Sequence, residues 1–106
     1  VTGEVLIVYL VPFCTVTLTG ATSTVSLGVT GSVSLFVAAT TATGITANLF
    51  WVDIAPDANG VALPAALKDI AITDNILVAS AVADTTGGAI RFDCYWIPLS
   101  ANGNVV

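Results

Sequence analysis

The residues that could carry chemistry are few, and the first to weigh are the two cysteines, Cys14 and Cys94. A cysteine nucleophile needs a histidine or a basic neighbour to lower its pKa, yet the chain has no histidine and only two basic residues, Lys68 and Arg91. Without histidine the chain also lacks the commonest general base and the commonest transition-metal ligand. We expect two buried thiols, because free cysteine is among the most buried residue types. A disulfide is the alternative, and catalysis is not expected.

One short segment carries oxygen ligands in a pattern that resembles part of a calcium loop. Asp53, Asp57 and Asn59 are followed by Gly60, and such residues recur in the loops that hold calcium. The further carboxylates and the distal acidic ligand of such a loop are missing. An Asx turn explains the same residues, so we expect a turn, no metal and no cofactor.

A second pair of carboxylates, Asp69 and Asp74, has the residue types of a glycosidase acid and base. Nothing near them marks a sugar subsite, and solvated turn carboxylates are far commoner. Together with the lack of histidine, this argues against an enzyme.

The aromatic residues offer a binding role instead of a catalytic one. Trp51 and Trp96 fall on apolar faces of their segments, which favours packing in the core over stacking on a sugar. Phe50 and Tyr95 point the other way and are better placed to contact a molecule outside the domain, such as another subunit.

Composition limits the possible partners. The chain has 106 residues, 56% of them hydrophobic and 8% charged, with a net charge of -5. Two basic residues cannot follow a phosphate backbone, so we expect no nucleic acid, and no run of about 20 apolar residues is present to cross a membrane. Because soluble chains usually carry ~25% charged residues, the neutral surface is expected to be covered by a partner.

The elements that must position these residues are strands, since Val and Thr dominate and side chains alternate between polar and apolar. We expect one domain over residues 1–106 with six to eight strands, an all-β antiparallel sandwich of jelly-roll type. The predicted strands cover residues 14–19, 23–30, 33–37, 47–54, 76–82 and 90–97, with a hairpin turn at 30–32, loops at 56–60 and 84–88, and one helical turn near 64–67.

The first run, residues 5–11, is apolar on both faces. Such a strand either lies in the middle of a sandwich or is covered by another subunit. We favour the second interpretation, because a small domain leaves much of its apolar surface unburied.

Five short phrases of the sequence form a recognisable set: TGEV at residues 2–5, VSLGV at 25–29, ATTAT at 39–43, FWVD at 50–53 and WIPLS at 96–100. Together they are similar to phrases of small β-rich accessory virion proteins of tailed bacteriophages. The resemblance covers most of the chain and implies a structural role without an active site, as a head-associated decoration protein or a fibre-like component.

The sequence therefore predicts a non-enzymatic structural subunit located in a virion. Its expected partners are copies of itself, with a trimer as one arrangement, and other virion proteins such as the major capsid protein. The predicted interface residues are Tyr9, Phe13, Phe36 and Phe50. Two alternatives remain open: a glycan-binding module that uses aromatic residues and calcium, and a surface filament or pilus-like subunit whose first strand is donated to a neighbour.

Overall fold

The fold was obtained as a computed structural model, which describes residues 1–83 and 85–105. Within them the chain forms eight strands and two short 3₁₀ turns. The strands are β1 (Val5–Thr19), β2 (Thr24–Val29), β3 (Ser32–Thr41), β4 (Leu49–Phe50), β5 (Asp57–Ala58), β6 (Lys68–Ile72), β7 (Ile76–Ala81) and β8 (Gly87–Pro98), and the turns are η1 (Ala42–Gly44) and η2 (Ala65–Leu67).

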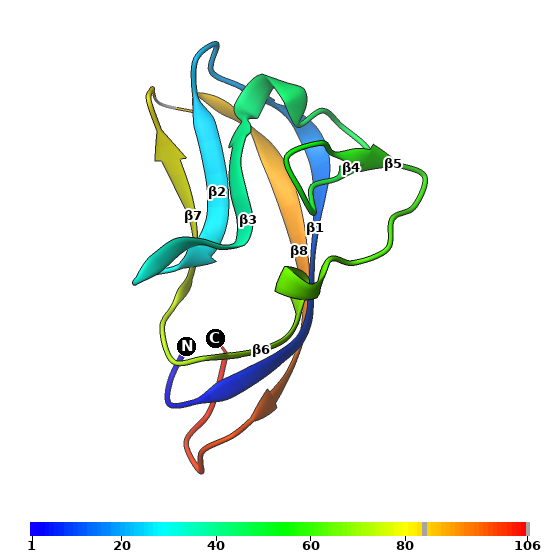
Figure 1. Cartoon of the computed structure of the whole chain (residues 1–106). Helices are drawn as coiled ribbons and strands as arrows, with labels where there is room; N and C mark the ends of the chain where they lie inside the picture. The colour runs from blue at the N-terminus through cyan, green and yellow to red at the C-terminus, as the bar shows by residue number, and fades with distance from the viewer. Residues whose placement is uncertain (84, 106) are drawn as a thin grey trace.

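These strands build two antiparallel sheets that face each other, so the predicted all-β sandwich is confirmed (Figure 1). In the larger sheet β1 is central: β8 pairs with one edge along nearly its whole length, while β6 and β4 pair with successive parts of the other edge. β5 continues this sheet beyond β4. The smaller sheet has the order β3-β2-β7. None of the helices among the described residues is long and apolar enough to cross a membrane.

β1 runs unbroken through Pro12, where the sequence pattern suggested a break between two runs. Proline cannot donate a backbone hydrogen bond, so it is tolerated where its missing N–H faces no partner. The carbonyls of Pro12 and Cys14 accept bonds from Trp51 N at 3.0 Å and Asn48 N at 2.8 Å, on the β4 side of β1. The missing N–H of Pro12 therefore lies on that side and leaves the pairing with β8 intact.

The core lies between the sheets, where the inward side chains of β1 meet those of β2 and β3. Trp51, just after β4, is fully buried, and its indole Nε1 donates a 2.9 Å hydrogen bond to Thr40 Oγ1. The prediction that Trp51 packs in the core is confirmed, and Trp96 packs against the core from β8 while remaining partly exposed.

Some predicted elements are confirmed and others are changed by local geometry. The hairpin turn between β2 and β3 and the helical turn before Leu67 are both present. The strand predicted over residues 47–54 shrinks to β4, because Asn48 adopts a left-handed φ of 70° and Asp53 ends the extended segment with a turn. In the predicted loop at 84–88, Asp84 lies outside the described residues, and the last two positions already belong to β8.

Candidate functional site

The outer face of the larger sheet carries two aromatic pairs that cross neighbouring strands. Tyr9 lies opposite Tyr95, and their rings stack with centroids 5.7 Å apart. Phe13 lies opposite Phe50, and their rings meet edge to face at 4.9 Å. Residues directly opposite each other on antiparallel strands are held within contact distance. The sheet register therefore brings together aromatic residues that are far apart in the sequence.

Four charged residues lie on this face: Arg91 and Asp93 on β8, Lys68 on β6 opposite Tyr9, and Asp57 on β5 opposite Phe50. The guanidinium carbon of Arg91 lies 5.0 Å from the centre of the Phe13 ring, and Arg91 Nε donates a 3.1 Å hydrogen bond to Asp93 Oδ2. Both charged side chains are more than half exposed, so water weakens their attraction and the ion pair adds little to stability. The face thus combines aromatic side chains with two positive groups, Lys68 and Arg91, and two negative groups, Asp57 and Asp93.

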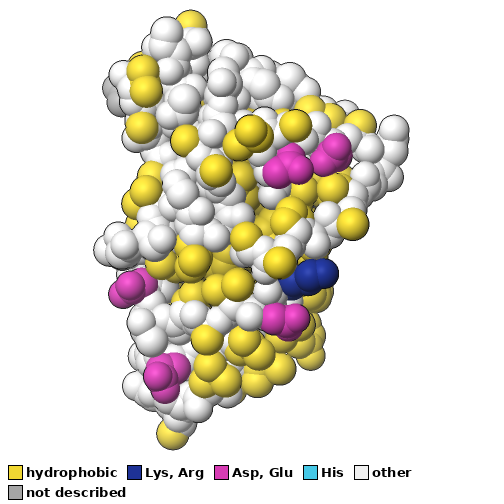
Figure 2. Space-filling view, in the orientation of Figure 1, with side chains coloured by type: hydrophobic (Ala, Val, Ile, Leu, Met, Phe, Trp, Pro, Cys, Tyr) yellow, Lys and Arg dark blue, Asp and Glu magenta, His cyan; other side chains and the backbone are white. Residues whose placement is uncertain are grey.

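We call this surface the aromatic face and define it by Tyr9, Phe13, Phe50, Arg91, Tyr95 and Ile97. Tyr9 is 39% exposed, Tyr95 54% and Ile97 46%. Monomeric proteins seldom leave such contiguous apolar surface uncovered unless a partner uses it. On the side of the molecule in Figure 2, hydrophobic side chains also gather over β6 and the adjacent part of β1, beside basic and acidic side chains. β6 itself begins with the exposed charged residues Lys68 and Asp69.

The structure brings three of the four predicted interface residues together and corrects the fourth. Tyr9, Phe13 and Phe50 all belong to the aromatic face. Phe36 is only 2% exposed and packs in the core. Strict alternation along β3 predicts that Phe36 points outward, but the register with β2 is irregular between Val25 and Leu27 and again before Val29. Phe36 and its neighbour Val37 are consequently both buried, which leaves Phe36 no surface for a partner.

The two cysteines do not form a disulfide. Cys14 lies opposite Ile90 in the β1–β8 register, whereas Cys94 lies opposite Leu10. Leu10 and Cys14 are four positions apart on β1, so the two cysteines are separated by about 13 Å along the strands. Cys14 is fully buried and its Sγ donates a 3.1 Å hydrogen bond to the carbonyl of Val16. Cys94 is a free thiol at an exposed position, so the expectation of two buried thiols is correct for Cys14 only.

This difference predicts selective thiol labelling. In dilute folded protein we expect Cys94 to react with a thiol reagent such as Ellman's reagent, and Cys14 to react only after unfolding. The Cys94 thiol is exposed but partly desolvated by its neighbours, which raises its pKa. Burial also raises the pKa of Cys14, and this effect is larger than the opposing effect of its hydrogen bonds to the backbone. The Cys94 rate should therefore still be rising at pH values where an ordinary cysteine has reached its plateau.

The raised pKa values of the two thiols also predict the direction in which stability changes with pH. A raised pKa means that the folded chain holds these protons more tightly than the unfolded chain, so stability falls as pH rises past the pKa of an ordinary cysteine. Mass spectrometry of the labelled peptide checks the assignment. Rapid labelling of Cys14 in the folded protein would contradict the burial described above.

The remaining sequence candidates do not assemble a site. Asp53 Oδ1 accepts a 2.8 Å hydrogen bond from Ala55 N, which is the predicted Asx turn. Among residues 1–83 and 85–105, no three acidic or cysteine side chains come close enough to hold a metal ion. Asp69 and Asp74 are both exposed, on β6 and in the turn before β7.

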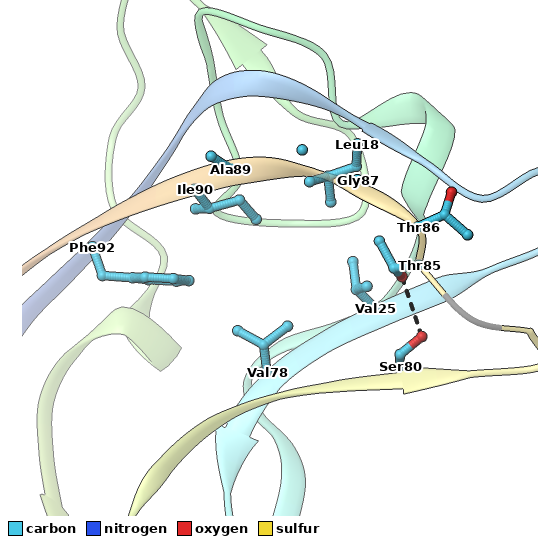
Figure 3. Close-up of a pocket in the computed structure, with 11 residues that line it drawn as sticks. Leu18, Val25, Val78, Ser80, Thr85, Thr86, Gly87, Ala89, Ile90 and Phe92 are labelled. Atoms are coloured by element: carbon cyan, nitrogen blue, oxygen red, sulfur yellow. Dashed lines mark hydrogen bonds between the residues drawn. The ribbon is translucent and has the colours of Figure 1, made fainter.

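A further feature, which the sequence pattern does not reveal, is a groove between the two sheets, where the edge strands β7 and β8 leave the sandwich open. We call it the lateral groove. Two adjoining hollows of about 390 and 240 Å³ form it, and Val78 and Phe92 line both. Figure 3 shows the larger hollow. One end is polar, because Ser80 and Thr85 join through a 3.1 Å hydrogen bond. The apolar wall includes Leu10, Leu18, Val25, Leu27, Ile76, Ile90 and Cys94.

Comparison with known proteins leaves the geometry as the main guide to function. No protein-family model, curated protein or solved structure matches the chain. The aromatic face and the lateral groove are therefore judged on their own chemistry.

Proposed function

We propose that the chain is a non-enzymatic structural subunit of a virion, which associates with copies of itself and docks on other virion proteins such as a capsid lattice. The observation that carries this proposal is the uncovered aromatic face, built from Tyr9, Phe13, Phe50 and Tyr95. Its chemistry fits protein recognition better than small-molecule binding, because the surface lies on a sheet and its rings stack on one another.

Burial of the aromatic face against a partner would lower the free energy of the complex. Aromatic side chains are enriched at the centres of protein interfaces and charged side chains are depleted there. Burial of apolar surface contributes roughly 25 cal/mol per Å², and rings held by cross-strand packing lose little conformational freedom on binding. The pairs Tyr9–Tyr95 and Phe13–Phe50 thus form a surface that is already ordered for contact with a partner.

The virion part of the proposal draws support from the sequence phrases that resemble tailed-phage accessory proteins. It also agrees with the needs of a subunit present in many copies. Such a subunit requires repeated contacts between sheet surfaces, and this chain presents a sandwich with few charged residues whose edge strands include β7 and β8.

The geometry gives less support to the two alternatives, a glycan-binding module and a filament subunit that donates its first strand. Trp51 is fully buried and cannot stack on a sugar, which leaves Phe50 and Tyr95 paired with other rings. Donation of the first strand to a neighbour would remove β1, which is paired on both edges and supplies Ile7 and Leu10 to the core.

A charge on the aromatic face tests the proposal. Tyr9→Asp is expected to lower the native mass of the self-associated chain, because association would bury the new carboxylate without a partner. The fold should persist, since Tyr9 is 39% exposed and loss of its stacking costs only about 0.5–1.5 kcal/mol. Light scattering on a sizing column measures the native mass, and a thermal melt shows whether the variant is folded.

Ser34→Asp is the matched control, because Ser34 is exposed on β3 of the other sheet. It should leave the native mass unchanged. Equal assembly of wild type, Tyr9→Asp and Ser34→Asp would count against the aromatic face as the interface. Phe36→Asp is unsuitable for this purpose, because a charge at that buried position would unfold the chain.

A further inference from the structure

β8 is a long edge strand with few of the usual protections against pairing. Its partner is β1, and no described strand pairs with its other edge. Natural edge strands are commonly protected by charged side chains, proline or bulges. Between Ile90 and Cys94 the β8 register with β1 is regular and the strand contains no proline before Pro98, so its protection in this stretch consists of the charges of Arg91 and Asp93.

The direction of the free backbone groups on β8 follows from the hydrogen bonds of β1. The carbonyls of Pro12 and Cys14 point away from β8, towards Trp51 and Asn48. In an antiparallel pair, residues opposite each other point their backbone groups both inward or both outward. Phe92 lies opposite Pro12 and Ile90 lies opposite Cys14. The N–H and C=O groups of Ile90 and Phe92, and by alternation those of Cys94, therefore point to the open edge.

We propose that two copies of this chain pair through these open edges, with β8 antiparallel to β8 of the second copy and the two-fold axis at Phe92. This inference rests on the self-association in the proposed function and adds a second contact to it, the β8 seam, separate from the aromatic face. Ile90 of one copy would then exchange backbone hydrogen bonds with Cys94 of the other, and the two Phe92 residues would bond to each other. Every outward-pointing group from Ile90 to Cys94 gains a partner.

The charges on β8 select this register. With the axis at Phe92, Arg91 lies opposite Asp93 of the second copy, and Asp93 lies opposite its Arg91. A one-residue shift of the axis places Arg91 opposite Arg91, or Asp93 opposite Asp93. Like charges directly opposite each other destabilise a strand pair, whereas opposite charges stabilise it. The sequence Arg91-Phe92-Asp93 is thus complementary to itself in one register, as a two-fold interface requires.

The inner side of the seam also gains from pairing. Phe92 is 39% exposed and lines the lateral groove, and in the dimer the two Phe92 rings would lie side by side at the axis. Cys94 would lie opposite Ile90 of the second copy, so its thiol labelling should slow as the dimer forms. The two larger sheets would join into one, with both aromatic faces on the same side.

Charge exchange tests the register. Arg91→Asp places two carboxylates opposite each other, and Asp93→Arg places two guanidinium groups opposite each other. Each single variant should weaken the dimer about tenfold or more, and the double variant Arg91→Asp/Asp93→Arg should restore most of the affinity. Analytical ultracentrifugation over a range of concentrations measures the dissociation constant. Thermal melts at low concentration show whether each chain remains folded.

Engineered disulfides test the same register without altering the charges. In a Cys94→Ser background, Ala89→Cys/Tyr95→Cys places the new cysteines opposite each other across the seam, at the Cα separation that a disulfide spans. Within one chain they are about 20 Å apart and cannot bond. Mild oxidation should give a covalent dimer. The control pair Ala89→Cys/Ile97→Cys fits only the register that opposes Asp93 with Asp93, and it should remain largely monomeric.

Several outcomes would overturn the β8 seam. A native trimer would overturn the seam while supporting the structural-subunit proposal. The seam would also be overturned if the double charge exchange fails to restore the dimer while Tyr9→Asp still abolishes assembly. Persistence of a dimer in Tyr9→Asp would support the seam, because the aromatic face is then not needed for it. A chain that stays monomeric at every concentration overturns the seam and removes self-association from the proposed function.

Discussion

Replacement of Trp51 by alanine is expected to lower the free energy of unfolding by about 3–5 kcal/mol, the range for large aromatic truncations in a core. Trp51 is fully buried between the sheets, and its indole Nε1 donates to Thr40 Oγ1 at 2.9 Å. The substitution leaves a cavity and removes one of the two hydrogen bonds of the buried Thr40 hydroxyl, which still donates to the carbonyl of Ala38. Because small domains are only marginally stable, the variant should be largely unfolded at moderate temperature.

Chemical denaturation followed by circular dichroism measures this loss, and the neighbouring residue supplies the control. Phe50 is half-buried on the opposite side of the same segment and packs on Phe13. Phe50→Ala should cost clearly less, about 1–2 kcal/mol. Equal losses for the two variants would show that Trp51 has no special place in the core.

Gly28→Ala is expected to destabilise the fold by about 1–3 kcal/mol, the range for an overpacked site. A Cβ at Gly28 would meet the carbonyl oxygen of Ser32 and lie 2.5 Å from the carbonyl carbon of Val33. Both are backbone atoms of the hairpin, so relief requires β2 and β3 to move apart. The midpoint of urea unfolding should fall accordingly.

Gly44→Ala is the matched control for that substitution. No atom lies within 4 Å of a Cβ built at Gly44, so alanine there should be neutral or stabilising by about 0.4–1 kcal/mol. A Gly28→Ala variant as stable as Gly44→Ala would mean that the hairpin approaches less closely than described.

The sequence predicts the fold class well because alternation is local. The hairpin at residues 30–32, the outward direction of Phe50 and the burial of Trp51 all follow from neighbouring residues. Phe36 was misplaced because irregular pairing between β2 and β3 interrupts the alternation. Such an irregularity depends on the partner strand, which the sequence pattern does not specify.

The four aromatic residues of the aromatic face, Tyr9, Phe13, Phe50 and Tyr95, could be named from the sequence, but their pairing could not. Tyr9 meets Tyr95, and Phe13 meets Arg91 and Phe50, only because β1 is central and has β8 on one edge and β4 on the other. The lateral groove was missed for the same reason. It exists because β7 and β8 are both edge strands, a property of the topology and not of either segment.

The central claim is that the chain associates with itself through its uncovered strand surfaces. The most direct test is the native mass of the wild-type chain, measured by light scattering over a range of concentrations beside Tyr9→Asp and Ser34→Asp. The account predicts a discrete oligomer for wild type and Ser34→Asp, and a smaller species for Tyr9→Asp. A clean monomer for all three at every concentration would contradict it.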